Sequence, residues 1–207
     1  MIIPAAGQSR RMGSHKLLLP LGPTTVIGNL LESLARPEIA AIHVVCRAGD
    51  LPLQQEVRRH GGQLLIPPID PPDMRSSVEF GLKEMVRQIR PAFSNGWILI
   101  PADHPLLSPA TLSRLLAHWI SAAPAILVPT FLGKRGHPAL FSWETAAFIP
   151  NIPPGKGLNW ILREAGLPVE ELEVDDPLVI EDMDAPDDYD RIRSLYKLNP
   201  SPKPSDA

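Results

Sequence analysis

The sequence predicts an α/β protein with three α/β/α layers, in which helices cover both faces of a mostly parallel, Rossmann-like sheet. Three observations predict this class. Short β-branched apolar runs alternate with longer segments of helical period. The 207 residues suffice for one well-buried domain, and the 25 prolines divide them into short elements. Without an internal repeat or long linker, we expect a single domain over 1–197 and a disordered tail over 198–207, rich in proline and serine.

The first two thirds of the chain alternate strictly between the two kinds of element. Pro37 stops the first helix, Gly61 follows the second, and Ser108-Pro109 provides a cap and a first-turn proline for the fourth. Such alternation gives right-handed crossovers, so the loops after the strands form one functional edge. The expected elements are a strand at 2–3, helix 25–34, strand 41–46, helix 53–60, strand 63–66, helix 76–89, strand 97–100, helix 108–121 and strand 125–128.

The alternation of predicted strands and helices becomes less regular after Pro129. Gly133 and Gly136 predict a hairpin within 130–141, because glycine accepts the positive φ of tight turns. The remaining expected elements are short helices at 143–148 and 158–165, a strand at 169–174 and a last helix at 186–196.

Composition excludes several classes of function. The net charge is −3, from 20 basic and 23 acidic residues, and aromatic residues make up 5%, which disfavours a nucleic-acid partner. One cysteine excludes a disulfide framework and a cysteine-based zinc site. No apolar run approaches the roughly 18 residues of a membrane span, and the start has no secretory pattern. We therefore expect a cytoplasmic protein with no membrane partner.

A loop of small residues follows the first strand, from Pro4 to Lys16. Small side chains let backbone N–H groups approach a phosphate closely. Arg10, Arg11, His15 and Lys16 would neutralise a polyphosphate. The alternative is a flexible glycine loop with solvated arginines.

Two familiar phosphate loops do not match this segment. The Walker loop has four residues between its glycines and a lysine directly after the second, whereas Gly7 and Gly13 are five residues apart and Lys16 lies three beyond. The dinucleotide fingerprint needs a glycine where Ser9 stands and an acid ending the second strand. A Rossmann oxidoreductase is therefore disfavoured.

Three aspartates are candidate ligands. Asp103 follows the buried strand at 97–100, so its carboxylate points into the ligand crevice, where it suits Mg²⁺. The alternative for Asp103 is a turn or helix-capping role. Asp182 and Asp184 alternate on an extended segment, so both would face one metal or one substrate. The alternative for this acid-rich segment is a solvated face.

The histidines lack the spacing of a metal site. His104 and His137 stand out because each precedes a proline in a loop expected to line the crevice. We therefore interpret these two side chains as candidates for contact with a ligand in the crevice.

A longer pattern contains the glycine loop. Ala5-Ala6-Gly7-x-Ser9-x-Arg11-Met12-Gly13-x-x-Lys16-x-Leu18-Leu19-Pro20-Leu21 resembles the signature of nucleotidyltransferases related to molybdenum cofactor biosynthesis, and its pattern is nearest to the molybdenum cofactor cytidylyltransferases. The likeness extends from about residue 2 to 195. Similar segments follow in the same order at Met74–Val78, Pro101–Pro105, Gly133–Pro138 and Asp182–Tyr189.

The resemblance implies the nucleotidyltransferase form of the Rossmann-like fold and a role for each matching residue. It implies catalytic roles for Arg11, Lys16 and Asp103, and an Mg²⁺ ion on Asp103, with Asp184, or alternatively Asp182, as the second ligand. His104, where the family often has another polar residue, would contact the second substrate with His137 and Asp182. The residues implied to bind the nucleotide are Ala5, Ala6, Gly7, Ser9, Arg11, Met12, Gly13, Lys16 and Ser76.

The implied reaction transfers CMP from CTP to a phosphate monoester and releases pyrophosphate. Members with Ala-Ala-Gly, as at 5–7, tend to use CTP. The implied acceptor is molybdopterin cofactor, with a molybdenum hydroxylase apoenzyme as a further partner. Two alternatives stay open: a sugar or polyol phosphate acceptor, because the opening segment also resembles methylerythritol phosphate cytidylyltransferases, and a non-catalytic carrier of molybdenum cofactor.

Overall fold

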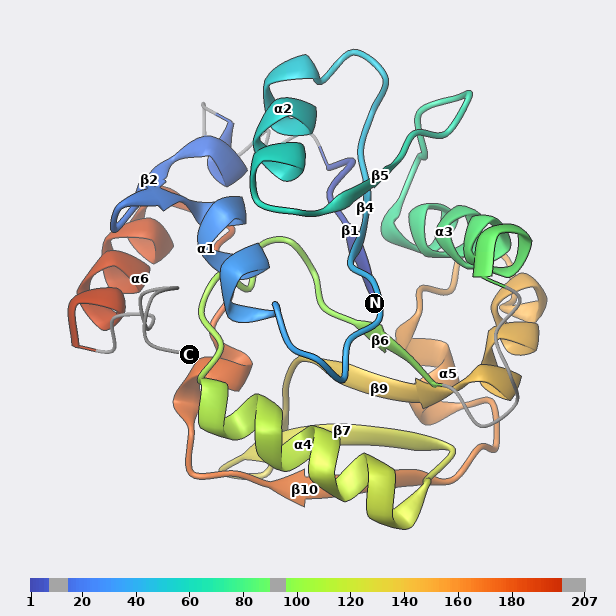
Figure 1. Ribbon diagram of the computed structural model, residues 1–207. Coiled ribbons are helices and arrows are strands. Elements are labelled where there is room, and N and C mark those ends of the chain that lie inside the picture. Colours follow the sequence, from blue (N-terminus) through green and yellow to red (C-terminus); the bar gives the residue numbers. More distant parts are fainter. Residues whose placement is uncertain (8–14, 90–95, 199–207) are drawn as a thin grey trace.

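The protein was studied as a computed structural model, which describes residues 1–7, 15–89 and 96–198. In these ranges a main sheet of eight strands crosses the molecule (Figure 1). Its strands, in spatial order, are β10 (Val169–Glu173), β7 (Ile126–Phe131), β9 (Ala139–Ser142), β6 (Gly96–Leu99), β1 (Ile2–Pro4), β4 (His43–Val45) and β5 (Gln63–Leu65), with β8 (Lys134–Arg135) pairing on β7.

The strand directions decide which loops meet. β1 runs parallel to both β4 and β6, β4 to β5, and β10 to β7. β9 is inserted antiparallel between β6 and β7. Consequently β9 begins at the edge where β1, β6 and β7 end, and the segment before β9 joins the loops that follow those strands.

Helices cover both faces of the sheet, which confirms the predicted three-layer α/β class. The core of one face includes residues of α1 (Val26–Ser33), α2 (Leu51–Arg59), α4 (Pro109–Ala122) and α6 (Pro186–Leu198). The core of the other face includes residues of α3 (Met74–Ile89), η2 (Trp143–Asn151) and α5 (Asn159–Arg163). Figure 1 shows α1 and α3 on either side of the central strands.

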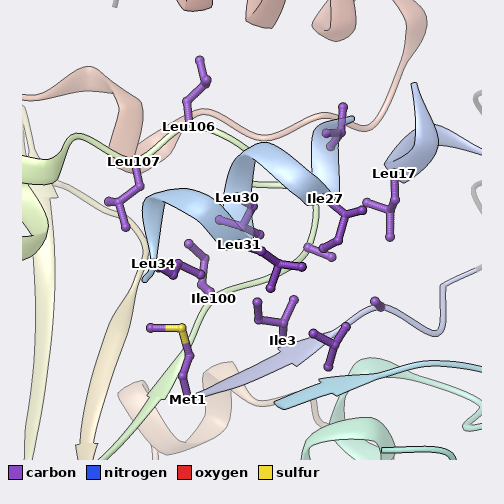
Figure 2. Packing of buried hydrophobic residues seen from close by; sticks show 14 of the residues in the cluster. Met1, Ile3, Leu17, Ile27, Leu30, Leu31, Leu34, Ile100, Leu106 and Leu107 are labelled. Carbon is purple, nitrogen blue, oxygen red and sulfur yellow. The ribbon is translucent and has the colours of Figure 1, made fainter. Parts of the chain in front are cut away.

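β1 has only three residues but is anchored on both faces. Its side chains alternate, so Ile2 packs in the core beside α3 and Ile3 in the core beside α1. Figure 2 shows Ile3 below the α1 residues Ile27 and Leu31. All four of these side chains are fully buried. Burial of each contributes about 1.5–3 kcal/mol, so the start of the following glycine loop is held firmly in place.

Capping side chains explain where the helices begin. The hydroxyl of Thr25 accepts the N–H of Gly28 at 3.1 Å and starts α1. Asp50 accepts the N–H of Leu53 at 3.4 Å, so α2 begins at Leu51, two residues before its predicted start. Two backbone N–H groups at the start of α6 donate to the Asp188 carboxylate, and these bonds lower its pKa.

The β7–β8 hairpin agrees with the turn predicted at Gly133, since Leu132 and Gly133 both have positive φ, 49° and 73°. The sequence patterns missed four short elements: η1 (Lys16–Leu18), β2 (Pro20–Leu21) and β3 (Thr24–Thr25), which form a hairpin, and η3 (Pro177–Ile180). Leu198, predicted to open the tail, is instead the last residue of α6, and the rest of the predicted tail lies outside the described residues.

Across the three described ranges, no helix has both the length and the apolar character that crossing a membrane requires.

Candidate active site

A cavity of about 320 Å³ opens where β1 and β6 end, and we call it the loop cavity. Its walls include Pro4–Gly7 and Pro101–Asp103. The N–H of Ala5 donates to the carbonyl of Val45 at 2.9 Å, so the chain leaves β1 in a fixed direction. A side chain at Gly7 would meet nothing within 4 Å, which leaves its backbone accessible from the cavity.

Lys16 lines the loop cavity, and its ammonium joins distant parts of the chain. Its Nζ donates to Asp103 Oδ2 at 2.8 Å, to Asp184 Oδ1 at 3.1 Å and to the carbonyl of Met183 at 2.7 Å. An ammonium has three N–H donors, and these three bonds occupy all of them. Lys16 and Asp103, both predicted from sequence, therefore lie in one cavity and in direct contact.

His15, expected beside the phosphates, faces another way. Its Nε2 lies 2.7 Å from Asp50 Oδ2, the carboxylate that caps α2. This pair fixes the backbone just before Lys16. Among the described residues of the predicted phosphate loop, Lys16 is therefore the cation that faces the loop cavity.

Asp103 and Asp184 are close enough to share one cation, because both contact the same ammonium. Hard carboxylate oxygens suit Mg²⁺ or Mn²⁺, which bind through one or two acids plus phosphate oxygens. Outside 8–14, 90–95 and 199–207, no three His, Cys, Asp or Glu side chains are grouped to hold a metal. This pair therefore fits an ion that obtains its remaining ligands from a substrate.

A second cavity of about 570 Å³ adjoins the first, and we call it the histidine cavity. Asp103 and Asp184 line both cavities, together with Met74 and Pro101. The two cavities therefore meet at the two carboxylates. Other side chains of the histidine cavity include Arg75, His104, His137, Phe141, Lys156 and Asp182.

His104 and His137 form a ring pair within this cavity. Their ring centroids are 4.6 Å apart and the ring planes are inclined by 65°. Burial lowers the pKa of His104, and it lowers the pKa of His137 to about 3. Both rings are therefore neutral near pH 7. The Nδ1 atom of each is buried without a hydrogen-bond partner among the described residues, so each ring keeps a polar atom that a ligand could engage.

Asp182 lines the histidine cavity but not the loop cavity. Desolvation raises its pKa, and the nearby charges of Asp184 and Asp103 raise it further. Asp182 and Asp184 thus lie on one side of the chain, as their alternation predicts, while only Asp184 contacts Lys16.

Four predicted nucleotide-binding residues lie outside the described residues: Ser9, Arg11, Met12 and Gly13. Ser76 lies in the first turn of α3, and its N–H donates to Asp73 Oδ1 at 2.7 Å. The neighbouring Ser77, which is buried, lines the loop cavity instead. The motif at 74–78 predicted Ser76 and not Ser77, because a motif does not tell which side of a helix faces a cavity.

Arg75 and Lys156 are two further cavity residues that the sequence analysis did not single out. Arg75 Nη1 donates to the carbonyl of Pro153 at 3.2 Å, and Lys156 pairs with Glu164 at 3.0 Å.

Comparison with curated proteins finds two relatives. The chain is 27% identical over 197 residues to the purine catabolism protein PucB of Bacillus subtilis (strain 168), covering 91% of this chain and 93% of that protein. It is 35% identical over 124 residues to 2-C-methyl-D-erythritol 4-phosphate cytidylyltransferase of Azoarcus sp. (strain BH72), covering 56% of this chain and 50% of that protein.

Solved structures are also similar to this chain along most of its length. Rv0371c from Mycobacterium tuberculosis H37Rv superimposes with a TM-score of 0.79 at 26% identity, covering 93% of this chain and 96% of that one. A manganese complex of Rv0371c superimposes with a TM-score of 0.73 at 25% identity and the same coverage. The model of the MobA-like NTP transferase domain matches residues 1–169. The chain therefore belongs to the MobA-like NTP transferase family, as its glycine-loop pattern predicts.

Proposed function

We propose that this nucleotidyltransferase transfers CMP from CTP to a phosphate monoester and releases pyrophosphate. The observation that carries the proposal is the pair of adjoining cavities that meet at Asp103 and Asp184. A transferase needs two substrate sites whose reacting atoms meet, and these carboxylates lie at that meeting point. The nucleotide would occupy the loop cavity and the acceptor the histidine cavity.

Within this arrangement, a phosphate oxygen of the acceptor attacks the α-phosphorus of CTP. A new P–O bond forms, the bond from the α-phosphorus to the bridging oxygen breaks, and pyrophosphate leaves. Both reactants are anions, and two unit charges about 4 Å apart repel by roughly 4 kcal/mol at an effective dielectric of 20. Positive charge and alignment therefore matter more than a strong base.

Asp103 and Asp184 would hold the divalent ion, Mg²⁺ or Mn²⁺. When bound, the ion would neutralise phosphate charge and polarise the P–O bonds. The manganese complex of Rv0371c supports a divalent ion in this family. Lys16 would donate to phosphate oxygens, as would Arg11 and the backbone of the glycine loop, with Ser9, Met12 and Gly13, as the family motif implies.

CTP is proposed over other nucleotides because of Ala5-Ala6-Gly7 and the named activity of the Azoarcus relative. For the acceptor we propose molybdopterin cofactor, on the branch resemblance of the motifs, which would make a molybdenum hydroxylase apoenzyme a further partner. A sugar or polyol phosphate is the second candidate, and the Azoarcus relative favours it. The carrier hypothesis predicts cofactor binding without turnover. Location in the cytoplasm stays a prediction.

The test measures pyrophosphate release from CTP, GTP and ATP with Mg²⁺ or Mn²⁺, first without an acceptor and then with each phosphate monoester. The expected result is release that requires both CTP and an acceptor, fastest with molybdopterin. Faster release with a sugar phosphate would select the second acceptor. Tight molybdopterin binding without release from any nucleotide would establish the carrier and reject the transferase.

A further inference from the structure

The Lys16 ammonium occupies the point where a metal held by Asp103 and Asp184 would be expected. Its Nζ lies 2.8 Å from Asp103 and 3.1 Å from Asp184, which are ordinary ion-pair distances. The Lys16 side chain is 14% exposed and that of Asp103 is 23% exposed, so water screens this pair only partly. The third donor is taken by the carbonyl of Met183 at 2.7 Å.

Two consequences follow from this geometry. With all three donors occupied, the ammonium has no N–H left for a phosphate. A divalent ion on the same two carboxylates would also lie within a few ångströms of Nζ, and like charges at that separation repel strongly. The ammonium cannot serve the phosphates, or share the carboxylates with an ion, while it keeps this position.

The surroundings allow the side chain to move while its backbone stays. The Lys16 carbonyl accepts the N–H of Leu19 at 3.3 Å, and the adjacent His15 is held by Asp50 at 2.7 Å. The lysine side chain itself is a flexible four-carbon stem, and Lys16 lines the loop cavity. A rotation of the stem would move Nζ within this cavity, which Ala5–Gly7 also line, without any rearrangement of the fold.

We propose that Lys16 is an exchangeable cation. Without nucleotide, its ammonium fills the place between Asp103 and Asp184 and competes with a divalent ion. When a triphosphate arrives, the ammonium moves to the phosphate oxygens and vacates the carboxylates. Divalent ion and nucleotide therefore bind cooperatively, which disfavours occupation of the site by metal alone. The nucleotide part of this inference rests on the proposed function, whereas the competition between metal and lysine does not.

The test measures Mn²⁺ binding to the full chain without nucleotide, by electron paramagnetic resonance of the free ion. The variants are Lys16→Met, which keeps the length of the stem and removes the charge, and Lys16→Arg, which keeps the charge. Lys83→Met is the matched control, because Lys83 forms a 2.7 Å ion pair with Glu79 on the outer surface of α3. All variants are first checked for folding by circular dichroism.

We expect Lys16→Met to bind Mn²⁺ about 10-fold more tightly than the wild type, or more, in the absence of nucleotide. Lys16→Arg and Lys83→Met should not gain affinity. Equal or weaker Mn²⁺ binding by Lys16→Met would overturn the proposal, since lysine would then not compete with the ion. An equal gain in Lys83→Met would overturn it as well, because the effect would be one of net charge.

A second measurement uses the wild-type chain and does not depend on how well Lys16→Met folds. The ¹⁵N signal of the Lys16 ammonium, assigned by its loss in Lys16→Arg, should persist with Mg²⁺ alone and shift when Mg²⁺ and CTP are added together. A shift of equal size with Mg²⁺ alone would contradict the exchange. Failure of CTP to support pyrophosphate release would reject cytidylyl transfer, but it would leave the competition seen with Mn²⁺ alone intact.

Discussion

The loop cavity and the histidine cavity share Asp103 and Asp184 but differ in the side chains that line the rest of each cavity. The loop cavity has an ammonium between two carboxylates and an open glycine backbone. The histidine cavity contains the neutral rings of His104 and His137, which meet edge to face. At the border between the cavities, Lys16 places a positive charge where a reaction between two anions would need it. Away from the border, the histidine cavity combines this neutral ring pair with the charged side chains of Arg75, Lys156 and Asp182.

The cavities also differ in how the fold builds them. The loop cavity uses the ends of the parallel strands β1 and β6, which are standard ligand positions in such sheets. The histidine cavity requires the antiparallel strand β9, because His137 precedes that strand. The N–H of His137 donates to the carbonyl of Val179 at 2.8 Å, which ties this segment to η3 and to the chain that carries Asp182 and Asp184.

The largest effect on activity is expected at Asp103, where the two cavities meet. Asp103→Asn removes one charge with little change in shape, so it weakens both the hold on Lys16 and the proposed ion site. Pyrophosphate release should fall by about 100-fold or more, roughly 3 kcal/mol of transition-state stabilisation. The control is Asp190→Asn, an exposed carboxylate that lies 3.8 Å from Arg193 on α6. Nearly normal turnover in Asp103→Asn would show that the reaction does not need the Asp103 carboxylate.

The second prediction concerns stability and tests the close contact between Gly136, before β9, and Val179 of η3. A Cβ on Gly136 would lie 2.3 Å from the carbonyl oxygen of Val179, a backbone atom that cannot move aside cheaply. Gly136→Ala should lower the free energy of unfolding by about 1–3 kcal/mol, as overpacking does. Gly49→Ala is the control, because its Cβ would meet nothing within 4 Å. Equal urea midpoints for the two variants would contradict the close contact with η3.

The neutral state of the His137 ring predicts a dependence of stability on pH. The pKa of His137 is about 3 in the folded protein and 6.5 in the unfolded chain, so only the unfolded chain gains this proton as pH falls through 6.5. Stability from this group is complete above that pH and should fall by about 2 kcal/mol between pH 7 and pH 5. Urea unfolding of His137→Asn should show a loss smaller by that amount. An unchanged loss would mean that His137 is charged when folded.

The smallest effect is expected at His104, and it should change the KM for the acceptor but not the affinity for the nucleotide. His104→Phe keeps an aromatic ring against His137 and removes the ring nitrogens. We expect the KM for the acceptor to rise by about 10-fold, while nucleotide affinity stays within about two-fold. His118→Phe is the control, since His118 pairs with Glu170 away from both cavities. A change in nucleotide affinity with an unchanged acceptor KM would reverse the assignment of the cavities.

Much of the fold was predictable because its signals are local. Apolar periodicity located the main helices and strands, and Gly133 marked the β7–β8 turn. The missed elements are two to four residues long, too short for a period to show. The end of α6 at Leu198 was missed because proline and serine further along were interpreted as a tail that began at this residue.

By itself, the sequence determined the alternation that makes a three-layer α/β protein and the glycine-loop pattern of the family. Only the tertiary structure decided that Lys16 joins Asp103 and Asp184, which lie 87 and 168 positions away. It also decided that Ser77 faces the loop cavity and that His104 meets His137. The physical reason is that periodicity and capping act over a few residues. Such contacts arise only when strand order and direction bring distant loops to one edge of the sheet.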